Sequence, residues 1–184
     1  MLRNALLIQL MFLFIPYQFA CASNYSEIAD EILHSYSKQM RKEYGLKVYG
    51  SGGRTYCDIH HIGIDYAYFD SISKEEARRL YVTVCEGLIQ KYNENKKIRP
   101  YFHNFPVTEN DIQVTIVFVN KQGNHFPLGS ITGICVGNDG QLRYISEDPK
   151  TPVLQILYAE PYVEAVRIVL EEKNKLVAAS GSNL

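Results

Sequence analysis

The sequence predicts an α+β domain with a single mostly antiparallel sheet of about five to six strands and about three helices packed on one face. A stripe of apolar residues at helical spacing over residues 73–93 indicates a long amphipathic helix. Apolar side chains alternate with period two over residues 58–69 and 112–119, which is typical of strands with one buried face. Long helical connections alternate with hairpins along the chain, which favours this arrangement over separate helical and β units.

The helix over 73–93 has a clear start signal. Ser73 and Glu76 have the spacing of a capping box, in which the hydroxyl and the carboxylate each satisfy an otherwise unpaired backbone N–H. The stripe consists of Ala77, Leu80, Tyr81, Val84, Leu88 and Tyr92. We expect this stripe to lie against the sheet.

An earlier helix is expected over residues 24–44, where apolar residues recur every four positions and Gly45 supplies a stop. A short strand over 46–49 follows, and then the glycine-rich segment 50–53. A phosphate cradle would need a helix directly after these glycines, whereas another strand pattern follows them. We therefore interpret 50–53 as a flexible hairpin loop.

The carboxyl-terminal half contains three further predicted strands and a helix. Strands over 130–136 and 141–146 flank residues 137–140, a strong hairpin signal, and a last strand is expected over 153–158. Glu160 or Pro161 should open the last helix, whose apolar stripe includes Leu170. This helix should end near residues 173–175, followed by a flexible tail over 177–184.

Length and charge restrict the classes of function. A chain of 184 residues favours one domain, which we place at residues 23–176. The formal net charge is −1, and no run of Lys or Arg exceeds a pair. Nucleic acid is therefore not an expected partner.

Residues 1–22 have the layout of a secretory signal peptide. Arg3 precedes a mostly apolar run, and Ala20 and Ala22 occupy the small-residue positions of a cleavage site. We expect cleavage after Ala22, a periplasmic or secreted protein, and only transient contact with the membrane. Two alternatives are an uncleaved anchor and a lipoprotein acylated at Cys21, which would be a lipid-anchored envelope component.

Two adjacent histidines are the first candidates for chemistry. His60 and His61 should point to opposite faces of a strand and so cannot readily bind one metal ion together. Asp58 shares a face with His60, and Asp65 shares one with His61, so either histidine could be oriented by a carboxylate. A small hydrolase using His60 or His61 is therefore one alternative, although no nucleophile motif surrounds them.

Cysteine, zinc and calcium patterns give little further support for a site. Cys57, Cys85 and Cys135 remain after processing, and Cys85 is best interpreted as a small buried apolar residue. Their disulfide pairing is open. Zinc-ligand spacing and an EF-hand pattern are missing from the sequence, so we predict neither a metal nor a cofactor.

The proline-bounded segment after the central helix holds the candidate binding residues Arg99, Tyr101 and His103. Two prolines should hold this segment in a short extended path. Arg99 could bind a carboxylate, either an internal one or one of a partner, while Tyr101 and Phe102 pack beside it. The alternative, which we favour, is a structural arginine that closes the loop onto the domain.

Several short motifs occur together in order. They are Tyr44-Gly45-Leu46, the glycines of 50–53, Glu75-Glu76-Ala77-Arg78, Ile98-Arg99-Pro100-Tyr101 and Glu160-Pro161-Tyr162. In this order they resemble an uncharacterised family of exported bacterial proteins, which implies export but no activity, cofactor or catalytic residue. The leading hypothesis is a non-catalytic binding or interaction domain whose partner is an unknown protein or small ligand.

Overall fold

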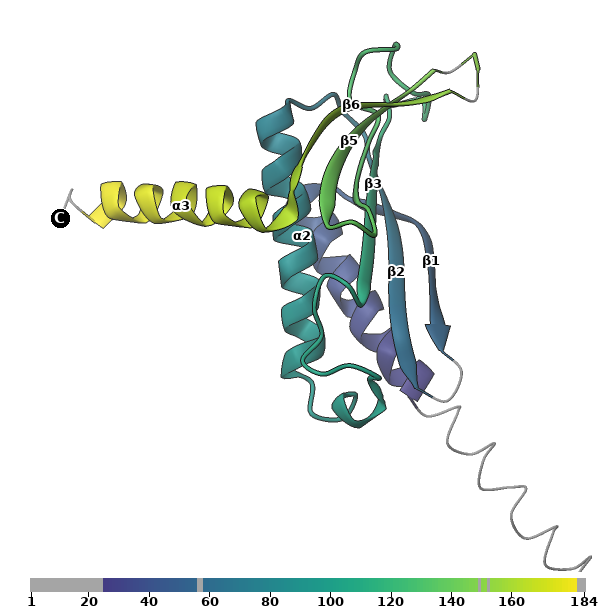
Figure 1. Cartoon of the computed structure of the whole chain (residues 1–184), viewed down its shortest axis with the longest axis vertical. Helices are drawn as coiled ribbons and strands as arrows, with labels where there is room; N and C mark the ends of the chain where they lie inside the picture. The colour runs from purple at the N-terminus through teal and green to yellow at the C-terminus, as the bar shows by residue number, and fades with distance from the viewer. Residues whose placement is uncertain (1–24, 56–57, 149, 152, 182–184) are drawn as a thin grey trace, which may run out of the picture.

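The computed structural model describes residues 25–55, 58–148, 150–151 and 153–181. The predicted signal peptide, Cys21 and Cys57 lie outside the described residues. A helix over residues 25–44 comes first. It is followed by β1 (Lys47–Thr55), β2 (Ile59–Tyr68), α2 (Lys74–Glu94), the short 3-10 helix η1 (Arg99–Tyr101), β3 (Ile112–Phe118), β4 (Gly133–Val136), β5 (Gln141–Glu147), β6 (Leu154–Pro161) and α3 (Tyr162–Gly181) (Figure 1).

The strands form one six-stranded sheet in the order of the sequence, from β1 to β6. Neighbouring strands are antiparallel except for β2 and β3, which run parallel with Ile64 opposite Val114. The connection between this parallel pair contains α2, as a parallel connection requires. The predicted α+β class with a mostly antiparallel sheet is therefore confirmed.

One hydrophobic core joins the sheet to the helices. Leu80, Val84 and Leu88 of α2 are buried in the same cluster as Ile64 of β2 and Ile116 of β3. Figure 1 shows α2 and the helix over residues 25–44 on the same side of the sheet. Buried tyrosines add hydrogen bonds between these layers: the Tyr81 hydroxyl donates to the Val114 carbonyl at 3.1 Å.

The predicted limits of α2 are confirmed. The Ser73 hydroxyl accepts from the Glu76 amide at 3.3 Å, and the Glu76 carboxylate accepts from the Ser73 amide at 3.1 Å. These reciprocal bonds form the capping box, and α2 begins at the next residue, Lys74.

The predicted stop of the first helix also has a structural basis. At the end of the helix over residues 25–44, Gly45 has a φ of 71°, a conformation that glycine adopts without strain.

The prediction of a flexible loop at residues 50–53 was wrong. The glycines lie inside β1 and pair with β2, where Gly53 is opposite Ile62. A Cβ atom at Gly53 would lie 2.7 Å from the carbonyl oxygen of His61. Glycine at this position therefore allows the two strand backbones to approach each other closely. The local sequence does not show whether a glycine serves such a close approach or a turn.

The last helix also differs from the prediction. It begins at Tyr162, directly after β6, and continues to Gly181, so residues 177–181 are helical rather than a loose tail. Tyr162 and Ala165 are buried, whereas Leu170 is exposed, so only the first turns pack against the core. Figure 1 shows the rest of α3 projecting from the body of the protein. Ala, Leu, Glu and Lys sustain a helix through their intrinsic propensity, which explains the extension.

Among the residues that the structure describes, none of the helices combines the length and the apolar character needed to cross a membrane.

Candidate metal centre

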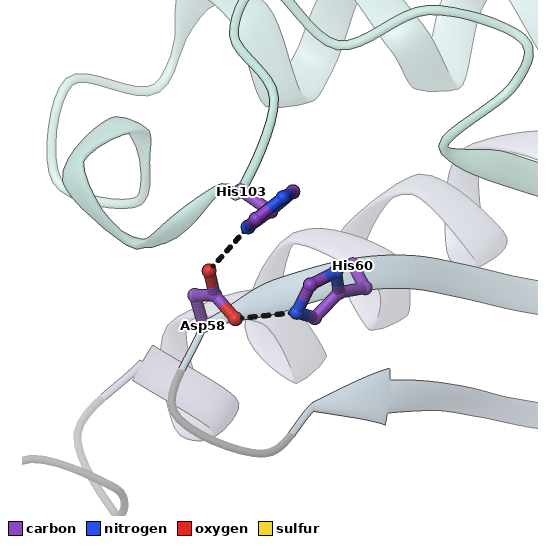
Figure 2. Close-up of side chains that lie close together, drawn as sticks. All are labelled: Asp58, His60 and His103. Carbon is purple, nitrogen blue, oxygen red and sulfur yellow. Dashed lines mark hydrogen bonds and ion pairs between the residues drawn. The ribbon is translucent and has the colours of Figure 1, made fainter.

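Asp58, His60 and His103 come together at the start of β2. The two oxygens of the Asp58 carboxylate face different rings: Oδ1 lies 2.7 Å from Nε2 of His60, and Oδ2 lies 2.8 Å from Nδ1 of His103. Figure 2 shows the carboxylate at the edge of the two imidazoles, contacting each of them, and the imidazoles come from different segments of the chain. The rings are stacked, with centroids 4.2 Å apart and an angle of 28° between their planes.

Strand geometry places two of these residues. Asp58 and His60 are two positions apart at the beginning of β2, so their side chains leave the backbone on the same side. The sequence predicted this shared face, and the ion pair between the two side chains confirms it.

Backbone pairing places the third residue. The His103 amide donates to the Ile59 carbonyl at 3.0 Å, and Phe102 forms a parallel bridge with Ile59. Phe102 is also buried in the core. The backbone of residues 102–103 is thus fixed against the start of β2, which holds the His103 ring next to Asp58.

Side chains of α2 and η1 fix the rest of this segment. The Arg99 guanidinium donates to the Asn93 carbonyl through Nε at 3.0 Å and Nη2 at 2.7 Å, and it lies over the Phe105 ring. The Asn93 side chain in turn exchanges two hydrogen bonds with the backbone of Val107. Arg99 therefore closes the loop onto the domain, as the favoured interpretation predicted.

The conformation of the proline segment was predicted incorrectly. Residues Arg99–Tyr101 form one turn of 3-10 helix instead of an extended path. Pro100 fits there because the first turn of a helix does not need its missing N–H. The chain becomes extended only at Phe102.

The three predicted binding residues do not form one site. The Tyr101 ring stacks on Tyr25 with centroids 5.3 Å apart, and Arg99 contacts Asn93 and Phe105. Only His103 reaches the Asp58 carboxylate. Binding of a partner carboxylate by Arg99 stays a prediction.

His61 lies apart from the cluster. Its Nε2 is 3.2 Å from Oε1 of Gln113 on β3, whereas the neighbouring His60 contacts Asp58. The prediction that the adjacent histidines point to opposite faces is therefore confirmed. Gln113, rather than Asp65, is the hydrogen-bond partner of His61 in the described part of the chain.

The cluster is electrostatically suited to a cation. The hydrogen bond from His103 lowers the pKa of Asp58; partial desolvation opposes this effect, and the nearby His60 adds to it. Asp58 is therefore ionised at neutral pH. All three side chains are partly exposed, so an ion from solution can reach them.

The donor atoms could serve as metal ligands. One nitrogen from each imidazole and a carboxylate oxygen all lie within 4.8 Å of one another. In a tetrahedral zinc site with bonds of about 2.1 Å, ligand atoms lie roughly 3.3–3.5 Å apart. Only small side-chain movements would bring one ion within bonding distance of all three groups.

The sequence did not predict this cluster because its third member is remote. Asp58 and His60 were recognised as a pair, but 43 positions separate His60 from His103, and the local spacing matches no zinc motif. The Asp-x-His spacing on a strand did indicate that Asp58 and His60 lie on one face. Identifying the third ligand required the fold.

The described cysteines are not part of the cluster. Cys85 is a free, buried thiol, and burial raises its pKa to about 12, so it behaves as the predicted small apolar residue. Cys135 is also free, and burial raises its pKa. The pairing of Cys57 lies outside the described residues.

Comparisons with known proteins return no matching family model, no matching curated protein and no matching solved structure. The resemblance to an exported bacterial family stays a prediction.

Proposed function

We propose that this protein is an exported binding protein that takes a divalent transition-metal ion at Asp58, His60 and His103. The observation that carries the proposal is the convergence of two imidazole nitrogens and one carboxylate from separate segments of the chain. β2 and the pairing of residues 102–103 with Ile59 position these groups.

The donor set favours zinc or a similar ion. Imidazole nitrogen suits Zn²⁺, Cu²⁺ and Ni²⁺, whereas Mg²⁺ and Ca²⁺ prefer sites made mostly of oxygen. Metal binding would replace the hydrogen bonds between Asp58 and the two rings by bonds to the ion. The nitrogens must lose their protons for this, so binding should weaken in acid.

Binding without catalysis remains the leading hypothesis. Within the described residues, neither His60 nor His103 hydrogen-bonds to a serine, threonine or cysteine that could act as a nucleophile. A small hydrolase is the second candidate, because the contact of 2.7 Å between Asp58 and His60 would orient that imidazole as a base. Hydrolysis of p-nitrophenyl acetate that His60→Ala abolishes and His61→Ala preserves would favour the hydrolase.

Export is a separate part of the proposal. It rests on the signal-peptide pattern of residues 1–22 and implies a periplasmic or secreted location. Mass spectrometry of the protein purified from a secreting host should find Ser23 at the amino terminus. An acylated Cys21 would instead indicate a lipid-anchored envelope component, and an intact Met1 would indicate an uncleaved anchor.

Calorimetric titration with Zn²⁺ tests the metal centre. We expect one ion per chain for residues 23–184, and binding at least about 100-fold weaker in His60→Ala and in His103→Ala, because each removes a ligand. His61→Ala is the matched control, since it removes an adjacent histidine on the opposite face of β2. It should bind Zn²⁺ as the wild type does.

The same titration can contradict the proposed metal site. Equal affinity in the wild type and in both ligand variants would contradict the proposed site. Circular dichroism and thermal unfolding of each variant would show that a loss of binding does not come from a loss of fold.

A further inference from the structure

A second candidate site lies in a groove between the helix over residues 25–44 and β1. The groove has a volume of about 650 Å³, and the metal-centre residues do not line it. Its floor is apolar and includes Leu33, Leu46 and Ile64. We call this feature the β1 groove.

The β1 groove leaves apolar surface of the sheet uncovered. Val48 and Ser51 pair with Tyr66 and Ile64 of β2, which face the core. Val48 is nevertheless 51% exposed, so the helix does not cover this part of β1. Apolar side chains of a ligand could therefore extend the core outward at this point.

The strand that borders the groove is an edge of the sheet. In the described part of the chain, β1 pairs with β2 alone. An edge strand presents backbone N–H and C=O groups that can pair with an added strand. Recognition by strand addition combines such backbone hydrogen bonds with side-chain pockets, and the β1 groove supplies the pocket.

The rim of the groove is cationic. Lys38 and Arg41 of the helix and Lys47 of β1 line it, with Asp30 as the acidic residue. No ion pair involves Lys38 or Arg41 within the described residues, and Lys47 lies over the Phe69 ring at 4.3 Å. These cations are available for carboxylates of a ligand.

We infer that the β1 groove binds an extended peptide segment of a partner protein, with alternating apolar and acidic residues, as an added strand beside β1. The apolar residues contact the floor of the groove, and the acidic residues pair with Lys38 and Arg41. The open edge of β1 favours a peptide over a single-chain amphiphile such as a fatty acid, which has no backbone amides to pair.

Fluorescence anisotropy with a labelled heptapeptide of alternating glutamate and valine tests the inference. We expect saturable binding to residues 23–184 at 150 mM salt, and binding about tenfold weaker or worse for the double variant Lys38→Glu/Arg41→Glu. Lys42→Glu is the matched control, because Lys42 is exposed on the same helix but does not line the groove. It should bind within about twofold of the wild type.

A second peptide separates strand addition from simple charge attraction. The same heptapeptide with alternate amides N-methylated keeps its charge but cannot pair along the β1 edge, so its binding should be lost. Equal binding of the methylated peptide, equal loss in Lys42→Glu, or no binding by the parent peptide would overturn the inference. Palmitate that binds the groove and displaces the peptide with no effect of methylation would assign the groove to an acyl ligand instead.

Discussion

At the scale of single residues, a bidentate ion pair between α2 and the sheet joins Arg78 to Glu160. The guanidinium donates to both carboxylate oxygens, through Nε at 2.8 Å and Nη2 at 2.9 Å. The side chains are 10% and 13% exposed, so this is a nearly buried pair. Tyr144 also donates to the Glu160 carboxylate, which connects β5 to the pair.

Removal of this carboxylate should destabilise the fold. Glu160→Ala leaves the Arg78 charge buried without its partner, and we expect the free energy of unfolding to fall by about 3 kcal/mol. Urea denaturation monitored by circular dichroism measures the change. Glu164→Ala breaks an exposed pair with Arg167, which solvent screens, and should change the free energy of unfolding far less than Glu160→Ala does. Equal effects of the two substitutions would contradict the structural role of Glu160.

The same pair predicts a dependence of stability on pH. Burial by itself raises the pKa of Glu160, but the hydrogen bonds from Arg78 and Tyr144 outweigh it and lower the pKa below its ordinary value of 4.5. The contribution of Glu160 is therefore complete above this value and is lost as the pH falls through the lower pKa of the folded state. The difference in stability between the wild type and Glu160→Ala should shrink as the pH falls from 6 toward 3. A difference that stays constant over this range would contradict the assignment.

Residue patterns predicted one contact of the cluster of Asp58, His60 and His103, although they predicted no metal ion. The spacing of Asp58 and His60 placed them on one face of a strand, and their contact follows from local geometry. His103 was selected for a different reason, as a neighbour of Arg99 in the proline segment. Its contact with Asp58 depends on the pairing of residues 102–103 with Ile59, which is a tertiary feature that local spacing does not encode.

At the scale of elements, two glycines of β1 test how closely β1 packs against β2. Gly52 and Gly53 are adjacent in the same strand, but a Cβ atom at Gly52 would have nothing within 4 Å, whereas one at Gly53 would lie 2.7 Å from the His61 carbonyl. Gly53→Ala should therefore reduce the free energy of unfolding by about 1–3 kcal/mol. Gly52→Ala should be neutral or slightly stabilising, because it only restricts the unfolded chain. Chemical denaturation of both variants measures the contrast, and equal effects would contradict this packing of β1 on β2.

Elements with two independent local signals were predicted most accurately. For α2, the capping box and the apolar stripe agree, and the helix begins where Ser73 predicted. For α3, the apolar stripe did not predict where the helix ends. The second half of α3 lies outside the core and stays helical because of the intrinsic propensity of its residues. For β1, the glycines indicated a loop because a local pattern does not reveal the close approach of a neighbouring strand.

At the scale of the whole molecule, the parallel pair β2–β3 explains where the candidate metal centre lies. The 10 residues of β2 extend about 33 Å, and the 21 residues of α2 return about 31 Å along the sheet. The segment after α2 therefore arrives at the start of β2, where Asp58 and His60 lie. The sequence predicted the helix and both strands, but not that β2 and β3 are parallel neighbours.

The central claim is that the fold brings Asp58, His60 and His103 into one metal centre, and anomalous diffraction tests it most directly. Crystals grown with Zn²⁺ should show a peak in the anomalous map at the zinc absorption edge, about 2.1 Å from Nε2 of His60, Nδ1 of His103 and a carboxylate oxygen of Asp58. A map with no peak between these groups, or with a peak only at another residue such as His61, would contradict the claim.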